Sequence, residues 1–552
     1  MKIEKSKRMC IFLLPVILAA AMLVHPPVFY LNDDVTMRSI LNGAYTGIAD
    51  GHAVYMKYPL TGILAFLYRI FGGVSWLELF FMLCMLLCMI LLADCFAQPV
   101  IGCLTALAVY MPFCLYMHYT LIAALAAGTA VFLLAFGKKS GWPVVLLLLA
   151  CLIRSEAGLL SLPFAAGAMV WRVILRPVQE WRKEIAGWLR YCIIFLGALA
   201  ICLLINSLCY ASPQWKDYLA YNDSRTLLYD YTDFLSTEHY GEEHTSYGMT
   251  KEEYQILYSY DTMLDGSIDK EKMEEVADAV YDNMQQQNST GQKWKECIRT
   301  YYIQMRFHDQ PYNYLCIAAY VLLGVGFLFG KKWLPLSMLV ILGAGRSSIW
   351  LYLIQRGRFP ERVSLSLYVI ELLLLLGMGV GLLQEKAVLS EKGRKIVTAT
   401  AILFLCILCG GLWKDTADRV QERTVLQRQW DVLKAYCEET PQRLYLVDVF
   451  STVEYSDMQY AADPENMMLM GGWMSASPLA AKRLEKLGVK DAAEALFYKE
   501  NVSLIAEKGR SMEWLEDYLC GRFGACSLEE AAVADGGAEK IFIEYRIRRH
   551  GE

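Results

Sequence analysis

Apolar residues in this chain come in blocks separated by short polar connections, and most blocks are about 18 to 22 residues long, the length of helix that crosses a hydrocarbon core about 30 Å thick. The pattern predicts a polytopic α-helical membrane protein with about eleven transmembrane helices, near 9–31, 74–95, 98–117, 119–137, 142–153, 157–175, 189–210, 312–330, 333–354, 363–383 and 396–413. The fifth and sixth are short, and together they also fit one hairpin with a break.

Basic residues in the connections indicate which side of the membrane each connection occupies. The first apolar block follows a basic N-terminus and lacks a small-residue cleavage site, which favours an uncleaved first span over a signal peptide. Further basic clusters fall on the same predicted side, at 138–139, 172–190, 331–332 and 386–395. Because positive charge marks the cytoplasmic face, we expect a multi-pass protein of the cell membrane with a cytoplasmic N-terminus and an extracytoplasmic C-terminus.

This topology leaves three segments on the outer face: 32–73, 211–311 and 414–552. The transmembrane domain is expected over 1–413, including the first two outer segments. The last segment alternates strand and helix patterns, which predicts a small extracytoplasmic α/β domain. Its expected strands are 443–448 and 540–546, and its expected helices include 478–488 and 511–520.

The composition limits the classes of function. The 552 residues are 56% hydrophobic and 20% charged, and the net charge of −5 argues against nucleic acid as a partner. Most of the 17 cysteines lie inside apolar blocks, where cysteine behaves as a small hydrophobic residue. The cysteines therefore predict no metal site.

Two adjacent carboxylates, Asp33 and Asp34, lie where the first span leaves the membrane. Carboxylates at a lipid boundary are costly unless they are solvated or bind something. One interpretation is a helix cap, with the Asn32–Asp34 side chains accepting backbone N–H groups of a helix from about Val35 to Asn42. We favour a functional one, in which an aspartate accepts a proton from a nucleophile or binds a divalent cation near a leaving phosphate.

A cluster of arginines, Arg356, Arg358 and Arg362, lies between the ninth and tenth spans. It is on the predicted outer face, so it departs from the charge rule that the other connections follow. Guanidinium groups match phosphate oxygens in bidentate geometry, which favours a phosphate-binding site. The alternatives are contacts with lipid headgroups or with the acidic 211–311 segment.

Other polar residues at the outer face are candidates for binding substrate. Arg154 and Glu156 interrupt an apolar run, where a charge either lines a cavity or forms an internal ion pair. A histidine and a lysine in the first outer segment are weaker candidates, because surface histidines and snorkelling lysines are common. The candidate substrate-binding residues are Arg38, His52, Lys57, Arg154, Glu156 and Glu361.

Taken together, this arrangement resembles the GT-C superfamily of membrane glycosyltransferases, which includes protein O-mannosyltransferases and the lipid A aminoarabinose transferase. In such enzymes an acidic residue or pair follows the first helix, and here Asp33 and Asp34 occupy that position. An amphipathic helix lies in the first outer loop, which matches 63–71. A soluble C-terminal domain on the outer face matches 414–552.

The resemblance implies an enzyme that moves a sugar from a polyprenyl-phosphate carrier to an acceptor on the outer face. Asp33 or Asp34 would be the general base, and Arg356, Arg358 and Arg362 would bind the donor phosphate. A divalent cation, Mg²⁺ or Mn²⁺, is a possible cofactor, with the two aspartates as its ligands. The alternatives are a transporter or flippase of lipid-linked sugars, and a non-catalytic membrane scaffold that binds wall polymers. The expected partners are the lipid-linked sugar and membrane lipids.

Overall fold

A computed structural model of the chain describes residues 2–138, 140–235, 247–287, 290–357, 359–385, 391–453, 464–535 and 541–550. A helix lies at each of the eleven predicted ranges, and within the described residues nine helices are long and apolar enough to cross a membrane. The eleven are α1 (Lys2–Val24), α4 (Trp76–Ala93), α5 (Pro99–Leu115), α6 (Tyr119–Phe136), α7 (Trp142–Ile153), α8 (Ser155–Ile174), α9 (Trp181–Cys209), α14 (Tyr312–Phe329), α15 (Trp333–Gln355), α16 (Glu361–Glu385) and α17 (Glu391–Glu439). The two shorter apolar helices are α5 and α7.

Helix α6 forms the centre of the bundle, with 94% of its length buried. Small residues bring α16 close to it: a Cβ added at Gly377 would lie 2.6 Å from the Phe132 carbonyl oxygen. The outer helices instead expose apolar side chains, as at Leu196, Leu322 and Phe329. A helical bundle with a buried centre and an apolar outer surface is the arrangement of a polytopic membrane protein.

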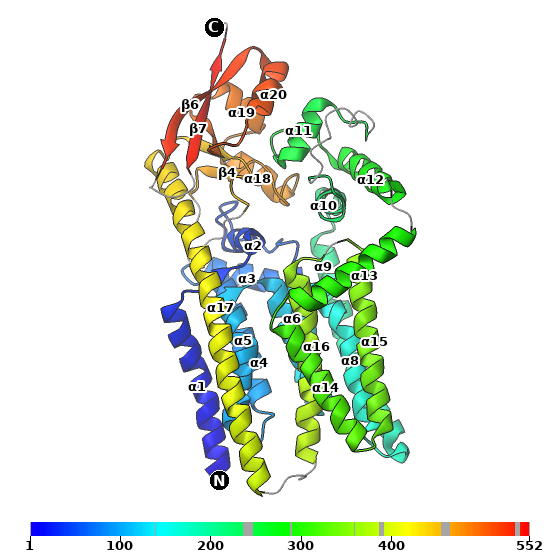
Figure 1. Cartoon of the computed structure of the whole chain (residues 1–552). Helices are drawn as coiled ribbons and strands as arrows, with labels where there is room; N and C mark the ends of the chain where they lie inside the picture. The colour runs from blue at the N-terminus through cyan, green and yellow to red at the C-terminus, as the bar shows by residue number, and fades with distance from the viewer. Residues whose placement is uncertain are drawn as a thin grey trace.

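The fifth and sixth predicted ranges, 142–153 and 157–175, form two separate helices, because the backbone is extended at Arg154 between α7 and α8. The predicted domain boundary at 413/414 lies inside α17, which runs without interruption from the bundle to the C-terminal domain (Figure 1). A single helix therefore joins the two parts.

The first outer segment lies across one end of the bundle as α2 (Asn32–Asn42) and α3 (Tyr58–Ile70) (Figure 1). A short parallel pairing between β1 (Val28–Phe29) and β2 (Tyr116–Met117) fixes the start of α2 to the junction of α5 and α6. The second outer segment forms α10 (Pro213–Tyr231), α11 (Lys251–Ser259), α12 (Lys270–Gln287) and α13 (Thr290–Phe307). The two ends of the chain lie at opposite ends of the molecule.

The C-terminal domain is a five-stranded sheet in the order β4-β3-β5-β7-β6. Strands β4, β3 and β5 are parallel, and β7 and β6 are antiparallel additions. The strands are β3 (Leu444–Val447), β4 (Met467–Leu469), β5 (Val502–Glu507), β6 (Cys526–Ala534) and β7 (Phe542–Arg549), and the helices are α18 (Pro478–Lys486), α19 (Ala492–Tyr498) and α20 (Glu513–Phe523). The predicted small α/β domain is present.

This domain packs against the outer segments with the carboxyl ends of its parallel strands. The buried guanidinium of Arg483 in α18 donates to the backbone oxygens of Ala44 and Tyr45 after α2, at 3.2 and 3.0 Å. A Cβ added at Gly471, after β4, would lie 1.8 Å from the Tyr260 backbone oxygen, so only glycine permits this approach. These contacts close a space between the domain and the end of the bundle.

Candidate functional site

A cavity of about 380 Å³ lies between α2, α10 and the C-terminal domain. Such positions between domains are where ligand sites commonly occur. Its polar lining comes mainly from the segments 32–73 and 211–311, with Arg362 added from α16, and much of its apolar lining comes from β4 and the turn after it. The residues that matter below are Asp33, Arg38, Tyr55, Arg225, Asp230, Tyr260, Arg362, Met467, Met468 and Trp473.

Asp33 lies in the first turn of α2 and lines this cavity. The N-cap of α2 is Leu31, which makes no side-chain cap bond. The interpretation of Asp33 as a helix cap is therefore wrong, because Asp33 lies inside the helix. Burial raises the pKa of Asp33 above its ordinary value. Positive charge acts in the opposite direction, in decreasing order from Arg362, Arg225 and Arg154. A carboxylate with a raised pKa among arginines is suited to accept a proton near an anion.

Asp34 has a different environment. It is fully buried, and its Oδ1 accepts the Tyr119 backbone N–H at 3.0 Å. Burial raises the pKa of Asp34 well above its ordinary value, although that hydrogen bond acts in the opposite direction. This carboxyl fixes α2 to the start of α6, and Asp33 is the member of the pair that lines the cavity.

Arg225 on α10 is a cation that hydrogen bonds hold in the cavity lining. Its guanidinium donates to Asn222 Oδ1 at 2.9 Å, to the Tyr260 hydroxyl at 2.5 Å and to the Tyr55 hydroxyl at 3.3 Å. The side chain is buried, so these bonds orient it in the lining. An oriented guanidinium beside Asp33 provides the anion-binding geometry that we expected from another part of the chain.

Of the two described members of the predicted arginine cluster, Arg362 lines the cavity and Arg356 does not. Arg356 is exposed and lies over the Tyr231 ring, 5.7 Å from its centroid. Arg358 is outside the described residues. Glu361 accepts from the Tyr30 hydroxyl at 3.0 Å and pairs with Arg419 of α17 at 2.9 Å, so it joins α16 to α17.

Arg154 and Glu156 form an ion pair of 2.9 Å, as one of the two interpretations predicted. Arg154 also lies over the rings of Tyr55 and Tyr119, and its charge acts on Asp33, so it belongs to the border of the site as well. Glu156 is largely exposed. Arg38 lines the cavity and pairs with the buried Glu78 of α4 at 3.8 Å.

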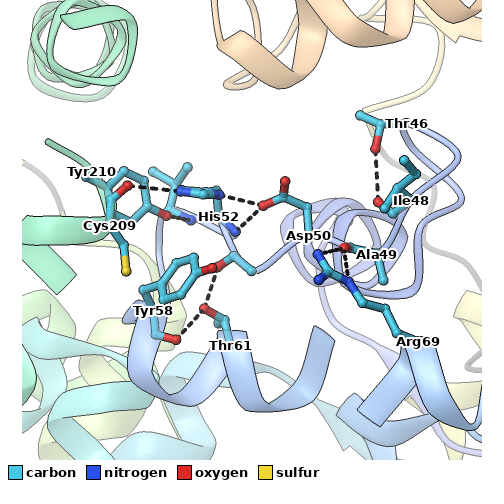
Figure 2. A network of polar contacts seen from close by, with 12 residues as sticks. Thr46, Ile48, Ala49, Asp50, His52, Tyr58, Thr61, Arg69, Cys209 and Tyr210 are labelled. Carbon is cyan, nitrogen blue, oxygen red and sulfur yellow. Dashed lines mark hydrogen bonds and ion pairs between the residues drawn. The ribbon is translucent and has the colours of Figure 1, made fainter. Parts of the chain in front are cut away.

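His52 belongs to a polar network beside the cavity (Figure 2). Its Nδ1 lies 2.5 Å from Asp50 Oδ1, its Nε2 lies 3.1 Å from the Cys209 backbone oxygen, and its ring stacks on Trp215. These contacts tie the first outer segment to α9 and α10. Lys57 is the N-cap of α3, where its backbone N–H donates to the Leu152 oxygen at 2.8 Å. Neither residue lines the cavity.

The proposed metal ligands were Asp33 and Asp34. Within the described residues no group of three or more His, Cys, Asp or Glu side chains is placed to hold a metal ion. Asp230 lines the same cavity and its negative charge acts on Asp33.

Sequence reasoning missed Arg225, Tyr260 and the cavity wall around Trp473. Arg225 is one basic residue in a long acidic segment, and only the packing of α10 brings it beside Asp33. The available signal was the Gly471-Gly472-Trp473 turn directly after a short apolar strand, which is typical of a close backbone approach. No protein-family model, curated protein or solved structure matches this chain.

Proposed function

We propose that the protein transfers a sugar from a polyprenyl-phosphate carrier to an acceptor hydroxyl on the outer face of the cell membrane, with the architecture of a GT-C glycosyltransferase. The observation that carries this proposal is the position of Asp33 among Arg362, Arg225 and Arg154 in a cavity next to apolar helices. The distribution of basic residues supports an extracytoplasmic position for this end of the bundle.

In this proposal, the arginines bind the phosphate of the donor. Arg362 lines the cavity and would supply the N–H fork that suits phosphate oxygens. The Arg225 guanidinium already donates to Asn222, Tyr260, Tyr55 and Thr226, so it contributes mainly its positive charge. As the bond between the sugar carbon and the phosphate oxygen breaks, the phosphate keeps the electron pair. The arginines stabilise that developing negative charge.

Asp33 takes the proton of the acceptor hydroxyl, whose oxygen forms the new bond to the sugar. A general base works best when its pKa lies near the working pH, and burial moves the pKa of Asp33 in that direction. Asp34 keeps the first turn of α2 in place through Tyr119.

A path for the lipid supports the assignment of the donor. Arg362 also lines a small second cavity of about 90 Å³. Its walls combine apolar residues of α5 and α16, such as Phe113 and Leu365, with charged residues such as Glu361 and Arg419. A phosphate at Arg362 would therefore have the sugar cavity on one side and a route toward the bundle on the other. A donor with a charged head and a long apolar tail fits this arrangement. A soluble nucleotide sugar has no apolar tail that would need a route toward the bundle.

The test is the release of free polyprenyl phosphate, which is a product whatever the sugar and the acceptor are. Membranes containing the protein would be supplied with short-chain polyprenyl-phosphate sugars, and the product measured by mass spectrometry. We expect Asp33→Asn to lower the rate about 10²- to 10⁴-fold, the usual contribution of a general base. Arg362→Ala should be severe, and Arg362→Lys should recover part of the rate, because an ammonium cannot copy the planar fork.

Arg356→Ala is the matched control, since it removes an arginine from the same connection but outside the cavity. It should keep nearly the full rate. Thermal stability is measured for every variant, so that unfolding is not mistaken for loss of catalysis. Normal release from Asp33→Asn and from Arg362→Ala protein would contradict the proposal.

A further inference from the structure

A second and larger cleft, of about 710 Å³, lies between α11 and α20 on the far side of the cavity wall. The residues that line it include Lys251, Glu252, Gln255, Tyr258, Phe450, Arg510, Glu513, Trp514 and Asp517. None of these takes part in the chemistry proposed above. The cleft therefore needs its own explanation.

The cleft lies at the topological switch point of the C-terminal sheet. The strand that follows β3, the middle of the three parallel strands, is β4 on one side of it. The strand that follows the neighbouring β5 is β6, which is reached through α20 and lies on the other side. The strand order thus turns in opposite directions at two neighbouring strands, an arrangement that leaves a crevice at their carboxyl ends. Phe450 follows β3 and Arg510 follows β5, and both line the cleft. Open α/β sheets bind their ligands at this point.

The lining combines aromatic rings with hydrogen-bonding groups. Tyr258 and Trp514 are partly exposed, from α11 on one side and α20 on the other. Glu252, Gln255 and Glu513 supply acceptors for hydroxyl groups, and Gln255 also supplies donors. Apolar faces for stacking beside many hydrogen-bonding groups suit a polyhydroxylated chain, whose sugar rings have both kinds of surface.

The charges of the lining argue for an uncharged ligand. Arg510 is held by Asp448 at 2.6 Å, and Lys251 lies 3.7 Å from Asp517 across the cleft. The remaining charged groups, Glu252 and Glu513, are negative. A phosphate-rich or carboxylate-rich polymer would meet no excess of positive charge here.

A thin wall separates the cleft from the catalytic cavity. Tyr260 faces the cavity and Phe450 faces the cleft, and their ring centroids are 6.3 Å apart. Arg225 lies over the first ring and Arg510 over the second. A chain held in the cleft would be kept next to the cavity, at a raised local concentration.

We propose that the cleft between α11 and α20 is a second binding site that holds a neutral glycan chain. This inference goes beyond sugar transfer and does not depend on it, because the cleft contributes no residue to the catalytic cavity. In a cell envelope, such a site would attach the C-terminal domain to a neighbouring glycan chain.

The test is equilibrium binding to the full-length protein in detergent without any donor. The probes are fluorescently labelled hexasaccharides of glucose, of mannose and of N-acetylglucosamine, with inorganic polyphosphate of similar length as the anionic comparison. We expect at least one neutral hexasaccharide to bind. Tyr258→Ala and Trp514→Ala should each weaken this binding by roughly tenfold, the effect of losing one aromatic contact.

Tyr498→Ala is the matched control, because Tyr498 is a half-exposed aromatic residue of the same domain outside the cleft. It should bind as the unchanged protein does. Glu513→Gln adds a variant at an exposed side chain that should fold normally and bind more weakly. Binding to polyphosphate alone, equal binding by all four variants, or no binding to any hexasaccharide at its highest soluble concentration would overturn the proposal. Because no donor is present, none of these outcomes bears on sugar transfer.

Discussion

Two buried carboxyl groups, Asp261 and Asp448, meet where the 211–311 segment contacts the C-terminal domain. Both side chains are fully buried. Asp448 accepts from the Ser451 backbone and hydroxyl at 2.7 and 2.6 Å and pairs with Arg510. Asp261 accepts from the Val449 N–H at 3.1 Å and contacts Asp448. Each keeps one oxygen that no partner satisfies within the described residues. Two buried carboxyl groups in contact are stable when they share one proton, and we place it on Asp261, whose pKa burial raises.

The pH dependence follows from this assignment. Burial raises the pKa of Asp261 well above its ordinary value, and the charge of Asp448 raises it further. A group with a raised folded-state pKa stabilises the fold fully below its unfolded pKa of about 3.9, and that contribution is lost as the pH rises through the folded pKa. The contact should therefore weaken in alkali.

Asp261→Asn should behave as a permanently protonated Asp261. Its amide oxygen can accept from Val449 and its N–H can donate to Asp448, so at alkaline pH the variant should be more stable than the unchanged protein by about 1–3 kcal/mol. Asp448→Asn instead breaks the pair with Arg510. Removing one partner of a buried ion pair costs about 3–5 kcal/mol, and we expect the lower end because Arg510 is 27% exposed.

The assay is thermal unfolding of the purified protein in detergent from pH 5 to pH 9. The unchanged protein should lose stability toward pH 9, Asp261→Asn should lose less, and Asp448→Asn should be destabilised throughout. Equal effects of the two substitutions would refute the shared proton. So would an unchanged protein that is no more sensitive to alkali than Asp261→Asn.

Two further substitutions test the packing of the fold. Gly471→Ala would place a Cβ 1.8 Å from the Tyr260 backbone oxygen. It should therefore move the C-terminal domain away from the cavity and lower the rate of polyprenyl phosphate release. Gly521→Ala is the control and should not change the rate, because a Cβ there meets nothing within 4 Å. Replacing Arg346 with Leu should destabilise the protein by about 3–5 kcal/mol in thermal unfolding, because it leaves the fully buried Glu371, now paired at 2.8 Å, without its partner. Replacing both residues with Leu should recover much of that loss, and a double variant as unstable as the single one would contradict this explanation.

The spans could be predicted from the sequence because a bilayer imposes one simple requirement, a continuous apolar length, on each helix. Strands β3 and β7 and helices α18 and α20 were also predicted, since their apolar patterns are clear. The short strand β4, with three residues, gave too little periodicity. The continuous α17 was missed because its charged half after Trp413 resembles a separate soluble helix.

The candidate site was only partly predictable, since it depends on contacts between distant segments. Asp33 was identified by its position after the first span. The sequence could not show that Asp34 differs from it, because that difference depends on the hydrogen bond from the Tyr119 backbone N–H to Asp34. The arginine cluster was singled out by its charge, and of its described members only Arg362 lines the cavity. Arg225 lies about 190 residues after Asp33 in the chain, so no local sequence pattern connects the two.

The most direct test of the central claim is the structure of the protein in a lipid nanodisc with a short-chain polyprenyl phosphate. We expect the phosphate in the cavity that Asp33 lines, within hydrogen-bonding distance of Arg362 and Arg225, and the lipid chain directed past Phe113 and Leu365 toward the bundle. A phosphate bound at Arg356 outside the cavity, or a cavity that stays empty at saturating lipid, would contradict the account.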